Sequence, residues 1–71
     1  MRNADWYNEG EKSFSLRGKS GYLYASLWAN ENGDWSLYVP EQFLIHFRAS
    51  CERVALYNAV QIIRLSGFYY E

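Results

Sequence analysis

Apolar and polar positions alternate with a period of two along most of residues 13–48. One set of alternate positions is apolar throughout, and we expect it to form the core: Phe14, Leu16, Leu23, Ala25, Leu27, Trp35, Leu37, Val39, Phe43, Ile45 and Phe47. The intervening set is polar or aromatic: Ser13, Ser15, Arg17, Tyr22, Tyr24, Ser26, Trp28, Ser36, Tyr38, His46 and Arg48. Because successive side chains of a strand point to opposite faces, the pattern predicts a sheet with one buried and one exposed face.

The turn residues predict how these strands pair. A three-residue loop that pairs Asn30 with Asp34, with Gly33 in the left-handed conformation, places Leu27 opposite Leu37. A two-residue turn at the same place would put apolar residues opposite polar ones, and a one-residue slip moves every side chain to the other face. The three-residue loop therefore predicts the register of this hairpin.

The same reasoning extends to the neighbouring strands. The loop before this hairpin would pair Leu16 with Leu23, and the loop after it would pair Val39 with Phe43. Residues 41–48 could also form a helix beginning near the single proline. The period-two spacing of their apolar residues favours a strand instead.

A helix is expected from Cys51 to Ser66, with Ser50 as its N-cap and Gly67 as its C-terminal stop. One apolar stripe should face the sheet: Cys51, Val54, Ala55, Ala59, Ile62 and Leu65. The predicted fold is α+β, a single domain over residues 1–71, in which one C-terminal helix packs on one face of a four-stranded antiparallel meander. Trp6 and Tyr7 could form an extra strand or plug an edge of the core, and the sequence does not decide between these.

A second apolar stripe of the helix consists of Leu56, Val60 and Ile63. An amphipathic surface helix usually has a narrower apolar arc than the two stripes together. Either the aromatic segment Phe68-Tyr69-Tyr70 folds over this stripe, or another chain covers it. In the second case a homodimer is the simplest assembly.

Composition and charge narrow the classes of function. The formal net charge is −1, which disfavours a protein whose main partner is duplex nucleic acid. One cysteine and one histidine cannot build a zinc site or an internal disulfide. We recognise no nucleophile with a base and no phosphate-binding glycine motif, so we expect no enzyme, no cofactor and no metal. The sequence has no membrane span and no secretion signal, which predicts a cytoplasmic protein.

The exposed face of the predicted sheet carries large aromatic side chains, which is the best sequence-level indication of function. Tyr22, Tyr24, Trp28 and Tyr38 would lie there, with Arg17 and Arg48 at the rim. Tyr, Trp and Arg are enriched among the residues that dominate protein interfaces. The same face could instead stack nucleic-acid bases, or its aromatic residues could only stabilise the sheet through cross-strand pairs.

Two resemblances add expectations about function. The segment 35–67, which contains SCERVALYNA at 50–59, resembles the last strand and helix of sheet-plus-helix DNA-binding domains. That resemblance implies a sheet face entering the major groove, with Arg17, Trp28 and Arg48 at the corresponding positions. In format, a near-neutral, aromatic-rich domain of this size is similar to small phage accessory proteins, many of which inhibit host defence as anti-CRISPR proteins do.

These observations lead to one expected function and one alternative. We expect a non-enzymatic module that binds a larger protein or complex as an inhibitor or regulator, with a homodimer left open. The alternative is nucleic-acid binding by the aromatic and basic sheet face.

Overall fold

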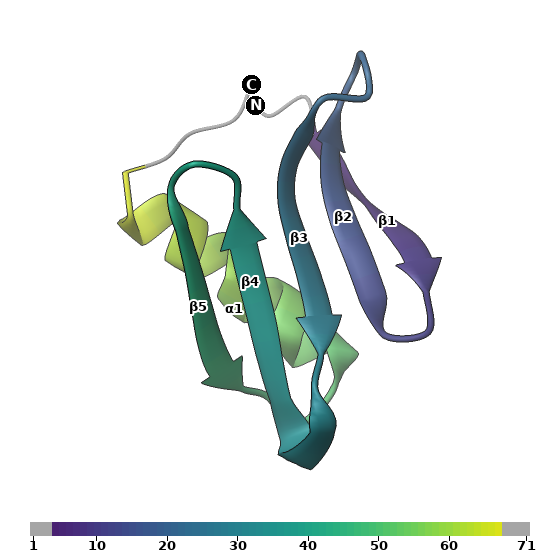
Figure 1. Ribbon diagram of the computed structural model, residues 1–71, viewed down its shortest axis with the longest axis vertical. Coiled ribbons are helices and arrows are strands. Elements are labelled where there is room, and N and C mark those ends of the chain that lie inside the picture. The colour runs from purple at the N-terminus through teal and green to yellow at the C-terminus, as the bar shows by residue number, and fades with distance from the viewer. Residues whose placement is uncertain (1–3, 68–71) are drawn as a thin grey trace.

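The computed structural model describes residues 4–67 as an antiparallel sheet with one helix on one face (Figure 1). Its elements are β1 (Ala4–Gly10), β2 (Ser13–Gly18), β3 (Leu23–Ala29), β4 (Asp34–Val39), β5 (Phe43–Arg48) and α1 (Glu52–Leu65), with a short 3-10 helix η1 (Glu31–Gly33) between β3 and β4. The strands lie in sequence order, β1-β2-β3-β4-β5. The α+β class and the C-terminal helix are therefore confirmed, but the strand count of four is wrong, since the sheet has five.

The additional strand is β1, which contains both residues that the sequence left undecided. Trp6 pairs with Leu16 and so lies on the helix side, whereas Tyr7 pairs with Ser15 and lies on the opposite face. The register shifts between Asn8 and Gly10, where the strand has a bulge. Asn, Glu and Gly are poor strand formers, so local sequence signals this strand weakly. Pairing with the backbone of β2 is what makes it a strand.

The registers predicted for β3, β4 and β5 are confirmed. Leu27 lies opposite Leu37, and the Asn30 N–H donates to the Asp34 carbonyl over 2.7 Å. Gly33 has the expected left-handed backbone, with φ of 78°. Residues 43–48 form a strand; a helix in this segment is excluded.

The register between β2 and β3 differs from the prediction by two residues. Leu16 pairs with Ala25 rather than with Leu23. A bulge between Leu16 and Arg17 then places Leu23 opposite Arg17, with Tyr24 as the additional residue of β3. A bulge inserts one residue into a strand, so it exchanges the faces of the residues beyond it.

This exchange moves two predicted side chains to the other face. Tyr24 packs against the buried core, and its ring covers Gly18, where a Cβ would lie 2.9 Å from Tyr24 Cε2. Leu23 shares the opposite face with Arg17 and is only partly buried. The predicted orientations of Tyr24 and Leu23 are therefore both wrong, because the extra residue is not visible in the period-two pattern.

The core forms between the sheet and one face of α1. The side chains of Leu27, Leu37 and Val39 in the middle strands are fully buried. From the helix, Ala55, Ala59 and Ile63 are fully buried. They are spaced four residues apart, so they fall on one helix face, and the two small alanines allow α1 to lie close to the sheet.

The helix differs from its prediction in its first residue and in the stripe it buries. It begins at Glu52 with Cys51 as N-cap rather than Ser50, and Cys51 makes no side-chain cap hydrogen bond. Cys51 is exposed and Leu65 is 86% exposed. The prediction that both residues face the core is therefore wrong. Ile63 is fully buried and cannot belong to a dimer face. The segment Phe68-Tyr69-Tyr70, one of the two covers expected over the second stripe, lies outside the described residues.

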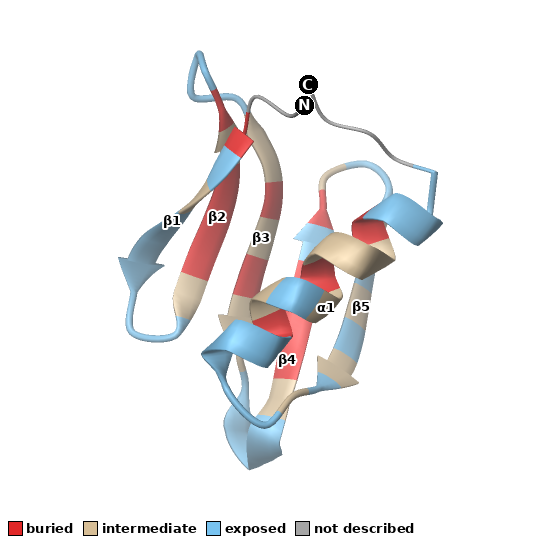
Figure 2. Ribbon diagram, turned by 180° about the vertical axis from the view of Figure 1, so that it is seen from behind, coloured by how far each residue is buried: buried red, intermediate tan, exposed pale blue. Residues whose placement is uncertain are grey.

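The helix covers only part of the inner face of the sheet. α1 crosses diagonally behind the sheet, and its C-terminal turn projects beyond β5 (Figures 1 and 2). Figure 2 shows that β1 and β2 extend to one side of the helix. On β5, Phe43, Ile45 and Phe47 pack against the core but remain partly buried. Both edges of the sheet therefore have incompletely covered apolar side chains.

We predict that Ile63→Ala lowers the free energy of unfolding by about 2–5 kcal/mol, because it removes a fully enclosed side chain. Leu65→Ala, two residues away on the same helix but exposed, should change it by less than about 0.5 kcal/mol. Urea unfolding followed by circular dichroism measures both values. Equal effects of the two substitutions would contradict the observed orientation of α1.

Candidate binding surface

The sheet face turned away from α1, called the outer face below, carries a row of exposed apolar side chains. Cross-strand pairing aligns Tyr7, Ser15, Ser26, Tyr38 and Leu44 across all five strands. Tyr7 is 48% exposed, Tyr38 40% and Leu44 52%. These three residues are called the exposed row, and at the usual strand spacing they span about 19 Å.

A second row adjoins the exposed row and adds a large aromatic ring. It aligns Ser13, Trp28, Ser36 and His46. Trp28 is partly buried and lies diagonally next to Tyr38, since Ser26 pairs with Tyr38 and Trp28 with Ser36. The predicted placement of Trp28 and Tyr38 on one face is confirmed by this register.

Three neighbouring polar residues are linked by hydrogen bonds. Asn30 Nδ2 donates to Ser36 Oγ over 2.7 Å, and Ser36 Oγ lies 2.8 Å from His46 Nδ1. A serine next to a histidine is the arrangement that activates a nucleophile, but Ser36 is only 1% exposed. The Ser36 hydroxyl is therefore enclosed, with Asn30 and His46 as its hydrogen-bond partners. Ser36 pairs with Trp28 across β3 and β4, so these polar residues lie next to that ring.

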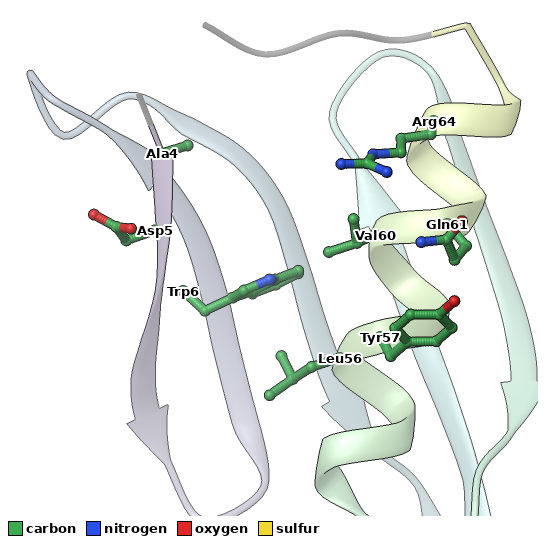
Figure 3. A pocket seen from close by; sticks show the side chains of 8 residues that line it. All are labelled: Ala4, Asp5, Trp6, Leu56, Tyr57, Val60, Gln61 and Arg64. Atoms are coloured by element: carbon green, nitrogen blue, oxygen red, sulfur yellow. The ribbon is translucent and has the colours of Figure 1, made fainter. Parts of the chain in front are cut away.

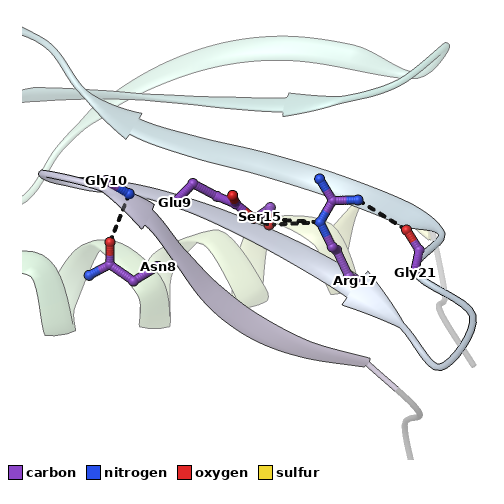
Figure 4. A network of polar contacts seen from close by, with 6 residues as sticks. All are labelled: Asn8, Glu9, Gly10, Ser15, Arg17 and Gly21. Carbon is purple, nitrogen blue, oxygen red and sulfur yellow. Dashed lines mark hydrogen bonds and ion pairs between the residues drawn. The ribbon is translucent and has the colours of Figure 1, made fainter.

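A second polar network fixes Arg17 on the outer face (Figure 4). Ser15 Oγ donates to a Glu9 carboxylate oxygen, and Arg17 Nε lies 3.2 Å from Ser15 Oγ and 3.5 Å from the same Glu9 oxygen. Arg17 Nη1 also donates to the Gly21 carbonyl over 3.0 Å. The Ser15 hydrogen bond and, to a smaller extent, Arg17 hold the pKa of the Glu9 carboxyl below its ordinary value. Arg17 is thus held by acceptors of its own chain.

Arg48 is held in the same way at the other end of the face. Its Nη1 donates to the Asn32 carbonyl over 2.8 Å and lies 3.7 Å from Asp34 Oδ1. Both arginines predicted to rim the surface are therefore present on it, but each already has acceptors within the chain.

The structure separates the four predicted aromatic anchors into two pairs. Trp28 and Tyr38 lie on the outer face, whereas Tyr24 lies on the inner face. Tyr22 precedes β3, is 63% exposed, and makes an edge-to-face contact with Tyr24 at a centroid distance of 5.0 Å. Tyr22 and Tyr24 are therefore not part of the same surface as the other two.

The sequence reasoning omitted two members of the exposed row. Leu44 alternates with His46 and Arg48, so the period of two was sufficient to place it on the outer face. Tyr7 was not predictable in this way, because its face depends on the register of β1 against β2.

A groove lies on the other side of the molecule, between β1 and α1 (Figure 3). Its volume is about 430 Å³. The Trp6 side chain points from β1 toward the helix, where Leu56 and Val60 face it, and Arg64 lies at one end of the groove. The two remaining residues of the predicted second helix stripe thus line this groove with Trp6. Ile63, the third, is buried.

Cys51 is exposed at the N-terminus of α1, away from the outer face. The backbone N–H of Val54, together with that of Arg53, favours the thiolate and lowers the pKa of Cys51. Among the described residues, no group of three His, Cys, Asp or Glu side chains could hold a metal ion. No helix within residues 4–67 is long and apolar enough to cross a membrane.

We predict that Ser15→Ala raises the pKa of Glu9 toward its ordinary value, because the hydroxyl hydrogen bond is the main cause of the lowering. Ser26→Ala, on the same face, should leave the Glu9 pKa unchanged. NMR titration of the side-chain carboxyl carbon measures both. A lowered folded-state pKa contributes stability that is complete above the unfolded-state pKa and is lost as the pH falls through the folded-state value.

The lowered pKa of Cys51 predicts its rate of alkylation. Alkylation by iodoacetamide requires the thiolate, so the rate in the folded chain should reach half its maximum at a lower pH than in the urea-unfolded chain. Mass spectrometry at a series of pH values measures both rates. Coincident pH profiles would show that the start of α1 has no effect on the thiol.

Comparison of the chain with protein-family models, curated proteins and solved structures finds no match in any of the three.

Proposed function

We propose that the chain is a non-enzymatic protein-binding module whose outer face docks on a larger protein and inhibits or regulates it by covering its surface. The observation that supports this most strongly is the exposed row, which lies beside Trp28 on the sheet face opposite α1. In many of the small phage accessory proteins that this chain resembles in format, such docking blocks a host-defence complex, and a complex of that kind is a candidate partner.

The composition of the outer face suits a protein partner. Tyr and Trp provide large contact areas at protein interfaces and are enriched among their dominant residues. Large apolar side chains that lie together on a surface are more informative than scattered ones. Tyr38 and Leu44 pair directly across β4 and β5, so they form one contiguous apolar area with Trp28 beside it.

The charges of the outer face favour a protein over nucleic acid. Arg17 contacts Glu9 and the Gly21 carbonyl, and Arg48 contacts Asp34 and the Asn32 carbonyl. Nucleic-acid affinity comes largely from cations that neutralise phosphates. Here each arginine has an acidic neighbour on the same face, which reduces its attraction for a phosphate.

We predict that Tyr38→Ala, Leu44→Ala and Trp28→Ala each weaken partner binding, by about 2 kcal/mol at a true anchor. Tyr57→Ala is the matched control, because Tyr57 is 64% exposed on α1, away from the outer face. Affinity capture from a lysate of the encoding organism, with quantitative mass spectrometry, compares the four variants with the unmodified chain. A protein retained equally by all of them would contradict the proposal.

Salt and nuclease separate this proposal from the nucleic-acid alternative. Phosphate-driven binding should weaken by around 10³ or more between 50 and 200 mM salt if about six phosphates are contacted. Binding centred on Tyr38 and Leu44 should change far less. Loss of all captured material after nuclease digestion would indicate nucleic acid as the partner.

A further inference from the structure

The two edge strands of the sheet differ in their protection against pairing with another chain. Edge strands are normally protected by charges, bulges or a covering segment. β1 has a bulge between Asn8 and Gly10 and carries the acidic residues Asp5 and Glu9. β5 pairs with β4 without any register shift and carries no acidic residue. Within residues 4–67, its outer edge is therefore a regular strand edge without acidic residues or a bulge.

The single formal charge of β5 does not protect this edge. Arg48 lies at the end of the strand, and its guanidinium contacts the Asn32 carbonyl and the Asp34 carboxylate. Those acceptors belong to the connection from β3 to β4 and to β4 itself, so the cation turns back over the sheet. The rest of β5 is apolar apart from His46.

The helix side of β5 is incompletely covered, while the helix end extends past it. Phe43, Ile45 and Phe47 point toward the core but remain partly buried. The C-terminal turn of α1 projects beyond β5 in both views (Figures 1 and 2). Leu65 ends that helix and is 86% exposed. The molecule thus has uncovered apolar side chains on β5 and an exposed leucine beyond its edge.

We propose that β5 pairs antiparallel with β5 of a second copy of the chain, which joins the two sheets into one in a two-fold symmetric dimer. The register is centred on Ile45, which lies opposite its own copy. Phe43 then lies opposite the second copy's Phe47, and Leu44 opposite the second copy's His46. In this register the side chains of each pair of opposite residues point to the same face of the joined sheet, as sheet pleating requires.

The two-fold symmetry makes the second copy a suitable occupant of this edge. Both helices lie on the same side of the joined sheet, and each C-terminal turn overhangs β5 of the other copy. Leu65 then lies over the end of the other strand, next to Phe47, which its own helix leaves partly exposed. A different protein bound at this edge would have to supply an equivalent apolar side chain of its own.

The charges agree with this arrangement. The two Arg48 side chains lie at opposite ends of the strand pair, about 20 Å apart. This distance exceeds the Debye length at physiological ionic strength, so salt screens their repulsion.

This interface differs from the helix stripe that the sequence left open as a dimer face. Ile63 is fully buried, and Leu56 and Val60 line the groove next to Trp6. The proposed dimer uses β5 and the C-terminal end of α1 instead. It does not depend on the proposed protein partner, because it forms from purified chain alone.

Sedimentation of the purified full chain over a range of concentrations tests the dimer. Leu65→Glu should raise the dimer Kd about tenfold or more, because it removes a buried leucine and adds a buried charge. Leu44→Lys should act in the same direction, since lysine protects strand edges. Tyr57→Glu on the same helix and Tyr7→Lys on the opposite edge strand are the matched controls and should leave the Kd unchanged.

Two outcomes of the sedimentation experiment overturn the proposal: a wild-type chain that remains monomeric at every concentration, or a dimer that Leu65→Glu does not weaken. Circular dichroism establishes that each variant is folded. If Leu44→Lys unfolds the chain, Leu65→Glu still decides, because Leu65 is exposed in the single chain.

Disulfide cross-linking tests the register. In a Cys51→Ser background, the double variant Leu44→Cys, His46→Cys should give a cross-linked dimer with oxidised glutathione, since directly opposite Cα atoms lie about 4.5–5.5 Å apart. Each single variant should cross-link far more slowly, because its cysteine lies diagonally across from the same cysteine of the second copy and not directly opposite it. Equal rates for single and double variants would overturn the register centred on Ile45.

Discussion

The inner face of the sheet is about twice as wide as the helix that must cover it. Five strands at the usual spacing span about 19 Å between the outermost strands, whereas a helix with its side chains is about 10–12 Å across. A single 14-residue helix therefore encloses the middle of the sheet and leaves both margins less covered. Leu27, Leu37 and Val39 in the middle are fully buried. Trp6 at one margin and Phe47 at the other are not.

The same mismatch explains where the molecule has surfaces available for contact. At the β1 margin, the gap between sheet and helix is the groove next to Trp6. At the β5 margin, Phe43, Ile45 and Phe47 remain partly exposed beside an unprotected strand edge. No helix of residues 4–67 lies on the outer face, so Tyr7, Tyr38 and Leu44 remain exposed there.

The two proposed contacts share Leu44 but otherwise use different parts of the sheet. Binding to a protein uses side chains of the outer face, whereas the dimer pairs the backbone edge of β5, so both can form together. A two-fold axis perpendicular to the joined sheet places both outer faces on the same side. A dimer could then bind two sites of one assembly, and the second contact would form at a high effective concentration.

Much of this fold was determined by the sequence alone. The alternation from Trp35 to Arg48 and the turn at Gly33 were sufficient for the registers of β3, β4 and β5, because a one-residue error would have mixed apolar with polar side chains. The tertiary structure decided the rest. β1 forms because β2 offers a strand to pair with, and the bulge beside Tyr24 exchanges the faces of Leu23 and Tyr24. In α1 the sequence placed Ala55 and Ala59 on the face toward the sheet, and both are buried. Only the tertiary structure showed that Ile63, from the second apolar stripe, completes this face, because the two alanines let the helix approach the sheet closely along that line.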